Sequence, residues 1–338
     1  MAVSIASRVD YPRLVVLLAD GELRSGEWLA RELAVSRAAV WKTVERLRTA
    51  GVEVIASARR GYRLPCAVEL LDAVAIEREM APARRAVLRR LELLFAVDST
   101  NSRLLEAPAP PACAADACVT ELQHAGRGRR GRRWTAPFGA SLAMSVAFTF
   151  ADAPRGLSAL SLAVGVALAR ALERAGACDI ALKWPNDIWI RERKAGGVLI
   201  ELKAEVSGPV HVVIGVGLNV SLREEHRREI EHSGVRVAAL ADACRRAPSR
   251  NAIAGAVLDE LLAMLGQFAQ GGFAPFRRGW EALDALEGRA VQVVLADAAI
   301  SGIARGVDED GALRVETSDG VRRFVSGEAS LRLIEGDA

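Results

Sequence analysis

The 338-residue chain carries 45 lysine and arginine residues against 42 aspartate and glutamate residues, and 51% of its residues are hydrophobic. This length and apolar content allow two or three domains, each with its own core. The apolar runs are shorter than a membrane span, and the N-terminus lacks the apolar core of a secretory signal, so we expect a cytoplasmic protein. The five cysteines are scattered and form no CxxC pair, which argues against a disulfide framework and a structural zinc site.

The positive charge is concentrated at the N-terminus. Residues 1–65 contain eleven basic and seven acidic side chains, whereas the remainder contains 34 and 35. This distribution is typical of a small nucleic-acid-binding module joined to a nearly neutral body.

Three short helices are predicted in this basic region. Tyr11-Pro12 begins the first, Ser25 or Gly26 the second, and Ser36 caps a third that ends at Gly51. The tight turn between the second and third helices predicts a helix-turn-helix.

The exposed face of the third helix and a basic hairpin are the candidate DNA contacts. Residues 52–64 predict a two-stranded wing, and Pro65 ends the module. A helical hairpin used for protein contacts is the alternative, and Trp41 could pack beneath the wing instead of touching a base. The predicted DNA-binding residues are Ser36, Arg37, Ala38, Trp41, Lys42, Arg59 and Arg60.

A bridging helix is predicted over residues 68–80 and a strand over residues 86–97, which ends at Asp98-Ser99-Thr100-Asn101. These small polar side chains could cap the next helix, or could bind a ligand rich in carbonyl and N–H groups. Residues 107–117, rich in proline and alanine, predict a surface loop.

Residues 126–134 read GRGRRGRRW, a pattern that fits neither an amphipathic helix nor a strand. Glycines let backbone N–H groups line an anion-binding concavity, and arginine binds carboxylate or phosphate through paired hydrogen bonds. Such runs also occur in flexible nucleic-acid-binding tails and on solvated surfaces. Predicted strands on both sides, residues 117–121 and 139–150, favour an enclosed loop for a ligand with more than one anionic group.

A buried helix is predicted over residues 157–176, followed by a meander of strands. Pro185 interrupts the first of these strands and places Lys183, Trp184, Asn186 and Asp187 at a distorted point. Lys194-Ala195-Gly196-Gly197 lies at a hairpin, and Gly215-Val216-Gly217-Leu218-Asn219 follows a later strand. A lysine beside close-approach backbone indicates an anion site.

Charged and then apolar helices are predicted over residues 221–285. From Leu286 onward the apolar pattern has period two, and Asp310-Gly311 and Asp319-Gly320 mark tight hairpins, so the last residues predict a small β-barrel. Arg332 is taken as a barrel surface residue by default. The predicted domains are 1–65, 66–285 and 286–338.

These motifs together resemble one family. The chain resembles the bifunctional biotin–protein ligases that also repress the biotin operon. The resemblance lies in four motifs that occur in order, GRGRRGRRW, KWPND, KAGG and GVGLN, after a winged helix-turn-helix and before the ending at residues 327–332. The resemblance covers essentially the whole chain. It implies an α+β multidomain fold: the winged helix-turn-helix, a central mixed α/β ligase domain of the class II synthetase type, and a C-terminal SH3-like barrel.

The resemblance implies an ATP-dependent, AMP-forming ligase. In the first implied step, biotin's carboxylate attacks the α-phosphate of ATP, which gives biotinyl-5′-adenylate and pyrophosphate. In the second, a lysine of the biotin carboxyl carrier protein of acetyl-CoA carboxylase attacks the activated carbonyl and AMP is released. Lys194, Arg129 and Asp187 are then the catalytic residues. The implied biotin-binding residues are Ser99, Thr100, Asn101, Gln123, Arg127, Gly128, Arg129 and Lys194. The implied nucleotide-binding residues are Arg130, Arg132, Trp134, Asn186, Asn219 and Arg332.

The remaining implications concern partners. Mg²⁺ is expected to bind together with ATP. Asp187 and Asn186 are expected to lie near Mg²⁺ or near the incoming lysine, and no residue is assigned as a metal ligand. The adenylate acts as corepressor and promotes a homodimer that binds operator DNA, and no membrane partner is expected. His124 departs from the small residue usual before the arginine loop, and could point to solvent or narrow the pocket mouth.

Two other functions fit parts of this pattern. A lipoate–protein ligase shares the chemistry and the body fold, although the arginine repeat favours biotin. A transcription factor whose ligase-like body is a passive sensor is the second alternative, and the intact Lys194 and arginine loop argue against it.

Overall fold

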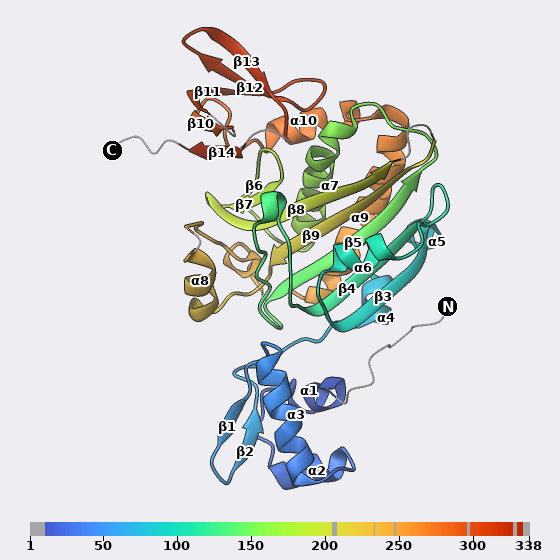
Figure 1. Cartoon of the computed structure of the whole chain (residues 1–338), viewed down its shortest axis with the longest axis vertical. Coiled ribbons are helices and arrows are strands. Elements are labelled where there is room, and N and C mark those ends of the chain that lie inside the picture. Colours follow the sequence, from blue (N-terminus) through green and yellow to red (C-terminus); the bar gives the residue numbers. More distant parts are fainter. Residues whose placement is uncertain are drawn as a thin grey trace.

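The computed structural model describes residues 11–204, 208–232, 234–246, 248–295, 298–326 and 330–333. Three parts follow one another along the long axis of the molecule: a small helical module, a central body built on a large sheet, and a small sheet at the opposite end (Figure 1). The α+β multidomain architecture expected from the sequence is confirmed.

The N-terminal module is a winged helix-turn-helix. Its elements are α1 (Tyr11–Leu18), α2 (Gly26–Glu32), α3 (Arg37–Thr49) and the paired strands β1 (Ile55–Ser57) and β2 (Gly61–Arg63). The hydroxyls of Ser25 and Ser36 accept hydrogen bonds from Trp28 N at 3.1 Å and Ala39 N at 3.2 Å. These bonds satisfy backbone donors that a helix start leaves unpaired, which is why α2 and α3 begin where the sequence predicts.

The apolar core of this module continues into the central body. Leu122 is 4% exposed and belongs to the same cluster as Leu47 and Val52, and Phe95 and Phe138 pack against it. Leu122 precedes the predicted biotin residue Gln123 in the chain. The N-terminal module is therefore seated directly on the strand that leads into the candidate site.

The central body is built on a seven-stranded sheet of order β3-β4-β5-β9-β8-β7-β6, in which β3 and β4 are parallel and all other neighbours are antiparallel. The strands are β3 (Leu88–Val97), β4 (Ala115–Gln123), β5 (Ser141–Phe150), β6 (Ile180–Lys183), β7 (Asp187–Ile190), β8 (Arg193–Ala204) and β9 (Val210–Asn219). Pro185 lies in the turn that joins edge strand β6 to β7, a position that leaves no ladder hydrogen bond unmade.

Apolar helices cover one face of this sheet (Figure 1). The remaining helices of the body are α4 (Ala73–Arg78), α5 (Pro82–Val87), α6 (Thr100–Glu106), α7 (Leu160–Arg174), α8 (Glu224–Glu231), α9 (Arg250–Gly271) and α10 (Ala274–Ala282), with 3₁₀ turns η1 (Arg129–Gly131), η2 (Leu157–Ala159) and η3 (Leu240–Asp242). α7 and α9 pack in the main core with the inward side chains of β5 and β9, such as Met144 and Ile214. The opposite face is left for α6 and the arginine loop.

α9 corrects one expectation from the sequence. Among the described residues it is the one helix long and apolar enough to cross a membrane, whereas no apolar run of that length was expected. In the fold, 61% of its most apolar window is buried, so these side chains are part of the body's core.

Three predicted boundaries were wrong. The helix expected over residues 68–80 is the shorter α4, because Leu71 N and Asp72 N bond the side chains of Glu121 and Asn251 at 2.6 and 2.8 Å and are not available to a helix. The strand expected from residue 86 begins at Leu88, after α5, and the expected loop 107–117 ends where β4 begins at Ala115.

The glycine-rich segment 215–219, which the sequence places after a strand, is itself part of strand β9. It is paired on both sides, with β5 and with β8. Glycine weakens an isolated strand, but backbone hydrogen bonds to two neighbours keep this segment extended.

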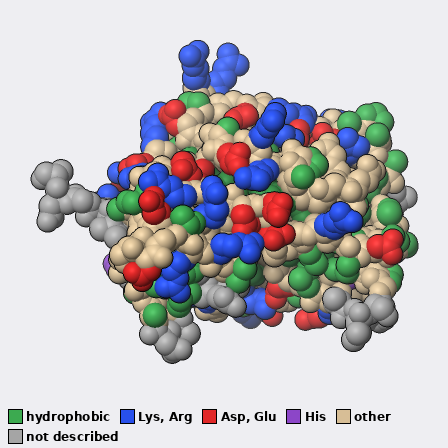
Figure 2. Space-filling view, turned by 90° about the horizontal axis from the view of Figure 1, so that it is seen from above, with side chains coloured by type: hydrophobic (Ala, Val, Ile, Leu, Met, Phe, Trp, Pro, Cys, Tyr) green, Lys and Arg blue, Asp and Glu red, His purple; other side chains and the backbone are tan. Residues whose placement is uncertain are grey.

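The C-terminal part is a five-stranded antiparallel sheet of order β13-β12-β11-β10-β14. Its strands are β10 (Ala290–Val294), β11 (Ala299–Val307), β12 (Leu313–Thr317), β13 (Gly320–Phe324) and β14 (Ser330–Leu333). The two predicted Asp-Gly hairpins lie between β11 and β12 and between β12 and β13. Figure 2, which views the molecule from this end, shows basic and acidic side chains interspersed, in agreement with a basic excess confined to the N-terminal module.

Candidate active site and DNA-binding surface

The uncovered face of the central sheet has a floor without large side chains. Gly215 and Gly217 of β9 lie opposite Ser145 and Ala143 of β5, and Gly217 also pairs with Gly197 of β8. A Cβ on Gly215 would stand 2.4 Å from Asn101 Oδ1. Glycine is therefore required here, because other parts of the chain lie directly against the backbone of the sheet.

A polar cluster forms one end of this floor, where β3 runs into α6. Gln123 Oε1 accepts from Thr100 N at 2.9 Å, and Ser145 Oγ lies 2.6 Å from Thr100 Oγ1 and 2.5 Å from Asn101 Oδ1. Ser99 caps α6 by accepting from Ser102 N. The Ser99 hydroxyl caps α6, which confirms the capping interpretation, and the hydroxyl of Thr100 lies in the cluster beside the floor, where the predicted ligand would bind.

Arg127 and Asn101 share a carboxylate at this end. Arg127 Nη2 and Asn101 Nδ2 lie 2.9 and 2.8 Å from Glu201 Oε2, and Arg127 also donates to Ser102 Oγ at 3.1 Å. Glu201 lies on β8, on the same face of the sheet as Gly197. This contact holds the first arm of the arginine loop across the floor.

The indole of Trp134 lies over Gly217. A Cβ on Gly217 would stand 2.4 Å from Trp134 Cε2, and Trp134 Nε1 is buried without a hydrogen-bond partner among the described residues. A buried indole N–H without a partner is costly, and a polar ligand can relieve that cost.

The arginine loop is a narrow hairpin that connects β4 to β5. Arg127 pairs with Arg133, Gly128 N donates to Arg132 O at 2.6 Å, and Arg130 takes the left-handed conformation in η1. The side chains of Arg130, Arg132 and Arg133 are exposed. The loop thus places two of its predicted ligand residues, Arg130 and Arg132, outside the enclosed part of the site.

Arg129 is the arginine that turns inward. It donates to Asn186 Oδ1 at 3.4 Å and to the carbonyl of Ser326 in the C-terminal part. Burial lowers its pKa, and the neighbouring Arg130 adds to that effect. An anionic ligand next to Arg129 would compensate for the solvation that this guanidinium has lost.

Lys194 and Asp187 form an ion pair at the other end of the floor, where β7 and β8 begin. Their side chains are 23% and 17% exposed, and Lys194 Nζ lies 3.5 Å from where a Cβ on Gly197 would stand. Asn186 Nδ2 donates to Val198 O at 2.6 Å and fixes the β6–β7 turn. An ammonium lying over glycine can turn toward a ligand without displacing a side chain.

The two remaining predicted nucleotide residues have different surroundings. Asn219 is 1% exposed, and its Nδ2 lies 3.1 Å from Ala238 O and 3.5 Å from Lys194 O, while its Oδ1 has no hydrogen-bond partner among the described residues. Arg332 lies in β14, and its backbone pairs with Gln292 of β10. The side chain of Arg332 lies outside the described residues.

Sequence reasoning missed three residues of this site. Ser145 and Glu201 were read as ordinary strand positions, although the alternation of β5 and β8 could have placed them on the open face. Lys183 was noticed at the distorted point but was given no role. It lies directly opposite Asp187 in the β6–β7 hairpin.

The described residues do not form a site of their own for Mg²⁺. They contain no group of three or more His, Cys, Asp or Glu side chains that could hold a metal ion. Asp187 pairs with Lys194, and Asn186 accepts from Arg129. Mg²⁺ often binds through substrate phosphates and water, with few protein ligands. We therefore assign neither Asp187 nor Asn186 as a direct ligand of Mg²⁺.

The predicted DNA-binding residues lie on the outer surface of the N-terminal module. Arg37, Ala38 and Lys42 are exposed along α3, and Arg59 and Arg60 at the tip of the wing. Trp41 is 55% exposed and so does not pack beneath the wing. The side chain of Ser36 caps α3.

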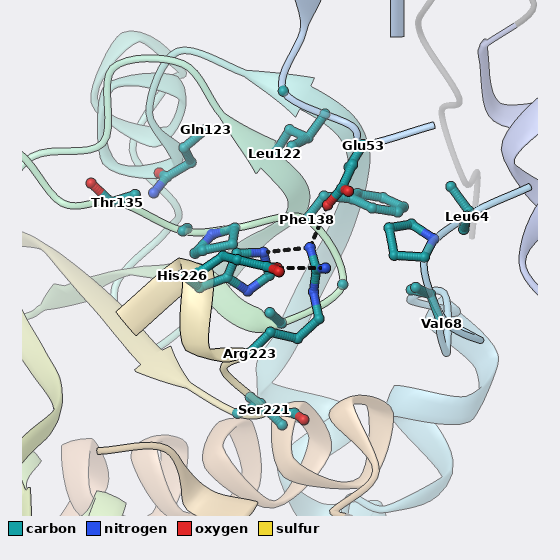
Figure 3. A pocket seen from close by; sticks show the side chains of 18 of the residues that line it. Glu53, Leu64, Val68, Leu122, Gln123, Thr135, Phe138, Ser221, Arg223 and His226 are labelled. Atoms are coloured by element: carbon teal, nitrogen blue, oxygen red, sulfur yellow. Dashed lines mark hydrogen bonds and ion pairs between the residues drawn. The ribbon is translucent and has the colours of Figure 1, made fainter. Parts of the chain in front are cut away.

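A cavity of about 720 Å³ lies between this module and the central body, beside the apolar contact that joins them (Figure 3). It is bordered by the end of α3, the linker after the wing, the second arm of the arginine loop and the start of α8. Arg223 spans it, in an ion pair with Glu53 and 3.1 Å from His226 Nε2. Burial, followed by the charge of Arg223, lowers the pKa of His226. His124 is exposed beside this cavity.

Fold and site together define a ligase of carboxylate substrates joined to a DNA-binding module. The Biotin/lipoate A/B protein ligase family model matches residues 94–219, an HTH domain model residues 13–63, and the Biotin protein ligase C terminal domain model residues 288–332. These ranges fall within the three predicted domains.

Known proteins resemble the chain over nearly its whole length. It is 38% identical over 323 residues to the bifunctional ligase/repressor BirA of Escherichia coli (strain K12), covering 96% of this chain and 97% of that protein. It is 29% identical to BirA of Bacillus subtilis (strain 168), covering 93% and 95%. The chain belongs to the biotin–protein ligase family, in its bifunctional ligase/repressor form.

Solved structures match about three quarters of the chain. A mutant form of the biotin protein ligase from Aquifex aeolicus in complex with biotin is 30% identical, with a TM-score of 0.63, and the match covers 73% of this chain and 99% of that one. The ligase from the same organism in complex with biotin and ATP is 28% identical, with a TM-score of 0.60 and coverage of 73% and 100%.

Proposed function

We propose that this protein attaches biotin to a lysine of a biotin carboxyl carrier protein in two steps. A carboxylate oxygen of biotin attacks the α-phosphorus of ATP, which forms biotinyl-5′-adenylate and releases pyrophosphate. The carrier lysine, as its neutral amine, then attacks the activated carbonyl, so that an amide forms, AMP leaves and the amine gives up a proton.

One observation supports this proposal most strongly: four segments far apart in the sequence meet over one glycine floor. They are the start of α6, the arginine loop, the β6–β7 turn and the start of β8. The hydroxyl and amide groups of Thr100, Asn101 and Gln123 suit the ureido group of biotin. The cationic side chains of Arg129 and Lys194 suit its carboxylate and the α-phosphate.

The first step needs positive charge, because it brings a carboxylate and a phosphate together. Prearranged cations stabilise the charge that develops in the transition state and need not reorganise during the reaction. We assign this role to Lys194 and Arg129, with Arg127 closing the biotin end. Trp134 is assigned to the adenine, and Arg130, Arg132, Asn219 and Arg332 to the nucleotide. Mg²⁺ enters with ATP, and no step is assigned to protein-bound metal.

The second activity is repression of biotin synthesis genes. We assign operator binding to the exposed side chains of α3 and the wing, with the adenylate as corepressor and a homodimer as the DNA-binding form. Leu122 and Phe138 join the module's core to the segments on either side of the arginine loop, which gives the ligand site a physical connection to the DNA-binding domain. We also propose that the protein acts in the cytoplasm and has no membrane partner.

Biotin-dependent exchange of labelled pyrophosphate into ATP tests the first step. We expect exchange with the full chain, ATP, Mg²⁺ and biotin, and none when biotin is omitted. Absence of exchange in the complete mixture would contradict the adenylation step. Retardation of DNA from the promoter of a biotin synthesis gene, with and without biotin and ATP, tests the repressor. Binding that ignores both ligands would contradict it.

A further inference from the structure

Three charged side chains lie on the same face of β6, β7 and β8. Lys183 is directly opposite Asp187 across the β6–β7 hairpin, and Lys194 is opposite Trp189, two residues after Asp187. Opposite residues in an antiparallel pair have Cβ atoms about 4.5–5.5 Å apart and point to one face. Two lysines therefore flank a single carboxylate.

The two lysines are held differently. Lys194 forms the ion pair with Asp187. Lys183 Nζ lies 4.9 Å from the ring centroid of Trp189, and among the described residues Lys183 forms no ion pair. Lys183 is thus a cation on the strand next to Asp187 that contacts the Trp189 ring and forms no ion pair with Asp187.

The proposed function requires Lys194 to leave this arrangement. Its ammonium must turn to the biotin carboxylate, which would leave Asp187, 17% exposed, without its present partner. Removing one partner of a partly buried ion pair is costly because the other charge stays poorly solvated. A replacement cation for Asp187 would lower the cost of releasing Lys194.

Other cations near Asp187 are less suited to that exchange. The guanidinium of Arg129 already donates to Asn186 and to the Ser326 carbonyl, and the side chain of Arg132 is exposed. Lys183 is on the neighbouring strand and in register. Burial lowers the pKa of Lys183 and the charge of Asp187 opposes that shift, which agrees with the proximity of the two groups.

The turn between Lys183 and Asp187 is bonded to its neighbours on two sides. Trp184, 1% exposed, donates from Nε1 to Gly311 O of the C-terminal part at 3.1 Å, and Asn186 bonds the backbone of β8. These bonds support the register that places Lys183 directly opposite Asp187.

We propose that Lys183 is a positioning residue: it forms the ion pair with Asp187 in place of Lys194 when Lys194 turns to the biotin carboxylate. Lys183 does not touch biotin in this scheme. It acts through Asp187, by making Lys194 available. The inference rests on the proposed function, because biotin binding is the event that draws Lys194 away.

The test is the dissociation constant of biotin for the full chain without ATP, which is independent of turnover. We expect Lys183→Met to weaken biotin binding about tenfold, within the coupling range of neighbouring charged residues. Lys183→Arg keeps a cation and should bind within about threefold of the original chain. Lys203→Met, which removes a lysine at the far end of β8, is the matched control and should have no effect.

The decisive comparison repeats Lys183→Met in an Asp187→Asn background, where no carboxylate at residue 187 needs a replacement cation when Lys194 turns away. The effect of Lys183→Met should fall below about twofold. An equal loss in both backgrounds, as a structural defect would give, overturns the inference, and so does unchanged binding in the original background. Lys183→Gln replaces Lys183→Met if the latter does not fold. Failure of the original chain to bind biotin would instead refute the proposed function.

Discussion

The indole of Trp134 lies against the backbone of Gly217, so that a Cβ at residue 217 would stand 2.4 Å from Trp134 Cε2 and 2.7 Å from Nε1. The two residues are 83 positions apart and belong to the arginine loop and to β9. Their contact places an aromatic face on the glycine floor beside Lys194. Any side chain on Gly217 must displace the indole.

Gly217→Ala should therefore weaken nucleotide binding selectively. We expect the KM for ATP in pyrophosphate exchange to rise about tenfold, because base stacking on an aromatic side chain contributes about 1–3 kcal/mol. Biotin affinity should change by less than about threefold. Gly266→Ala in α9, where a Cβ meets open space, is the control. An unchanged KM would remove Trp134 from the nucleotide site.

Lys194→Met should slow adenylation by about 10² to 10³, the cost typical of losing one prearranged charge-stabilising group. Since Asp187 then loses its partner, a folding defect is the competing explanation. Single-turnover rates should therefore be compared with urea unfolding of the same protein. Near-normal adenylation by a folded variant would exclude Lys194 from the mechanism.

Asp284 makes stability depend on pH. Burial raises the pKa of its carboxyl to about 6, its Oδ1 accepts from Leu286 N at 2.9 Å, and its Oδ2 is buried without a partner among the described residues. The folded state holds this proton more tightly than the unfolded state, so the carboxyl lowers stability increasingly as pH rises from about 4 to about 6, and fully above that.

Asp284→Asn should accordingly raise the free energy of unfolding at pH 7.5 by about 1–3 kcal/mol, and should have little effect at pH 4. Urea unfolding at the two pH values measures the difference. Asp152→Asn, at an exposed position, controls for loss of charge. An equal effect at both pH values would show that packing, not titration, governs this position.

Trp41 is exposed on α3 between residues that we propose contact DNA, so its removal distinguishes a role in DNA contact from a role in packing. We expect Trp41→Ala to weaken operator binding about 5- to 100-fold, as for loss of a direct base contact. Thermal stability should change by less than about 0.5 kcal/mol. A large loss of stability with unchanged operator affinity would reverse this interpretation.

Features set by neighbouring residues could be predicted from the sequence. Ser25 and Ser36 are local caps, so the starts of α2 and α3 were correct. The two Asp-Gly hairpins of the C-terminal sheet are equally local. Runs of apolar and β-branched residues indicated the strands that flank the arginine loop, and therefore the loop itself.

Features set by distant residues could not be predicted. The bonds of Glu121 and Asn251 to residues 71 and 72 shorten the bridging helix, and nothing near that segment in the sequence indicates them. Nothing near the glycines of β9 in the sequence shows that they continue the strand, because the pairing with β5 and β8 that keeps them extended involves distant residues. The fold explains these glycines, because Asn101 packs against the backbone of Gly215 and Trp134 against that of Gly217.

The candidate site shows the same division. Composition and family resemblance indicated Lys194 and the arginine loop, but the role of Lys183 depends on a register that places it opposite Asp187. The separation of Arg129 from its neighbours is also a tertiary effect, because its inward turn depends on Asn186 and on the C-terminal part.

The most direct test of the central claim is the intact mass of a biotin carboxyl carrier domain after incubation with this protein, ATP, Mg²⁺ and equal concentrations of biotin and lipoate. We predict that the carrier gains the mass of one biotinyl group, and that replacement of its acceptor lysine prevents the gain. Lipoyl addition would contradict the assignment of the pocket while retaining the adenylation chemistry. A carrier of unchanged mass would contradict ligase activity altogether.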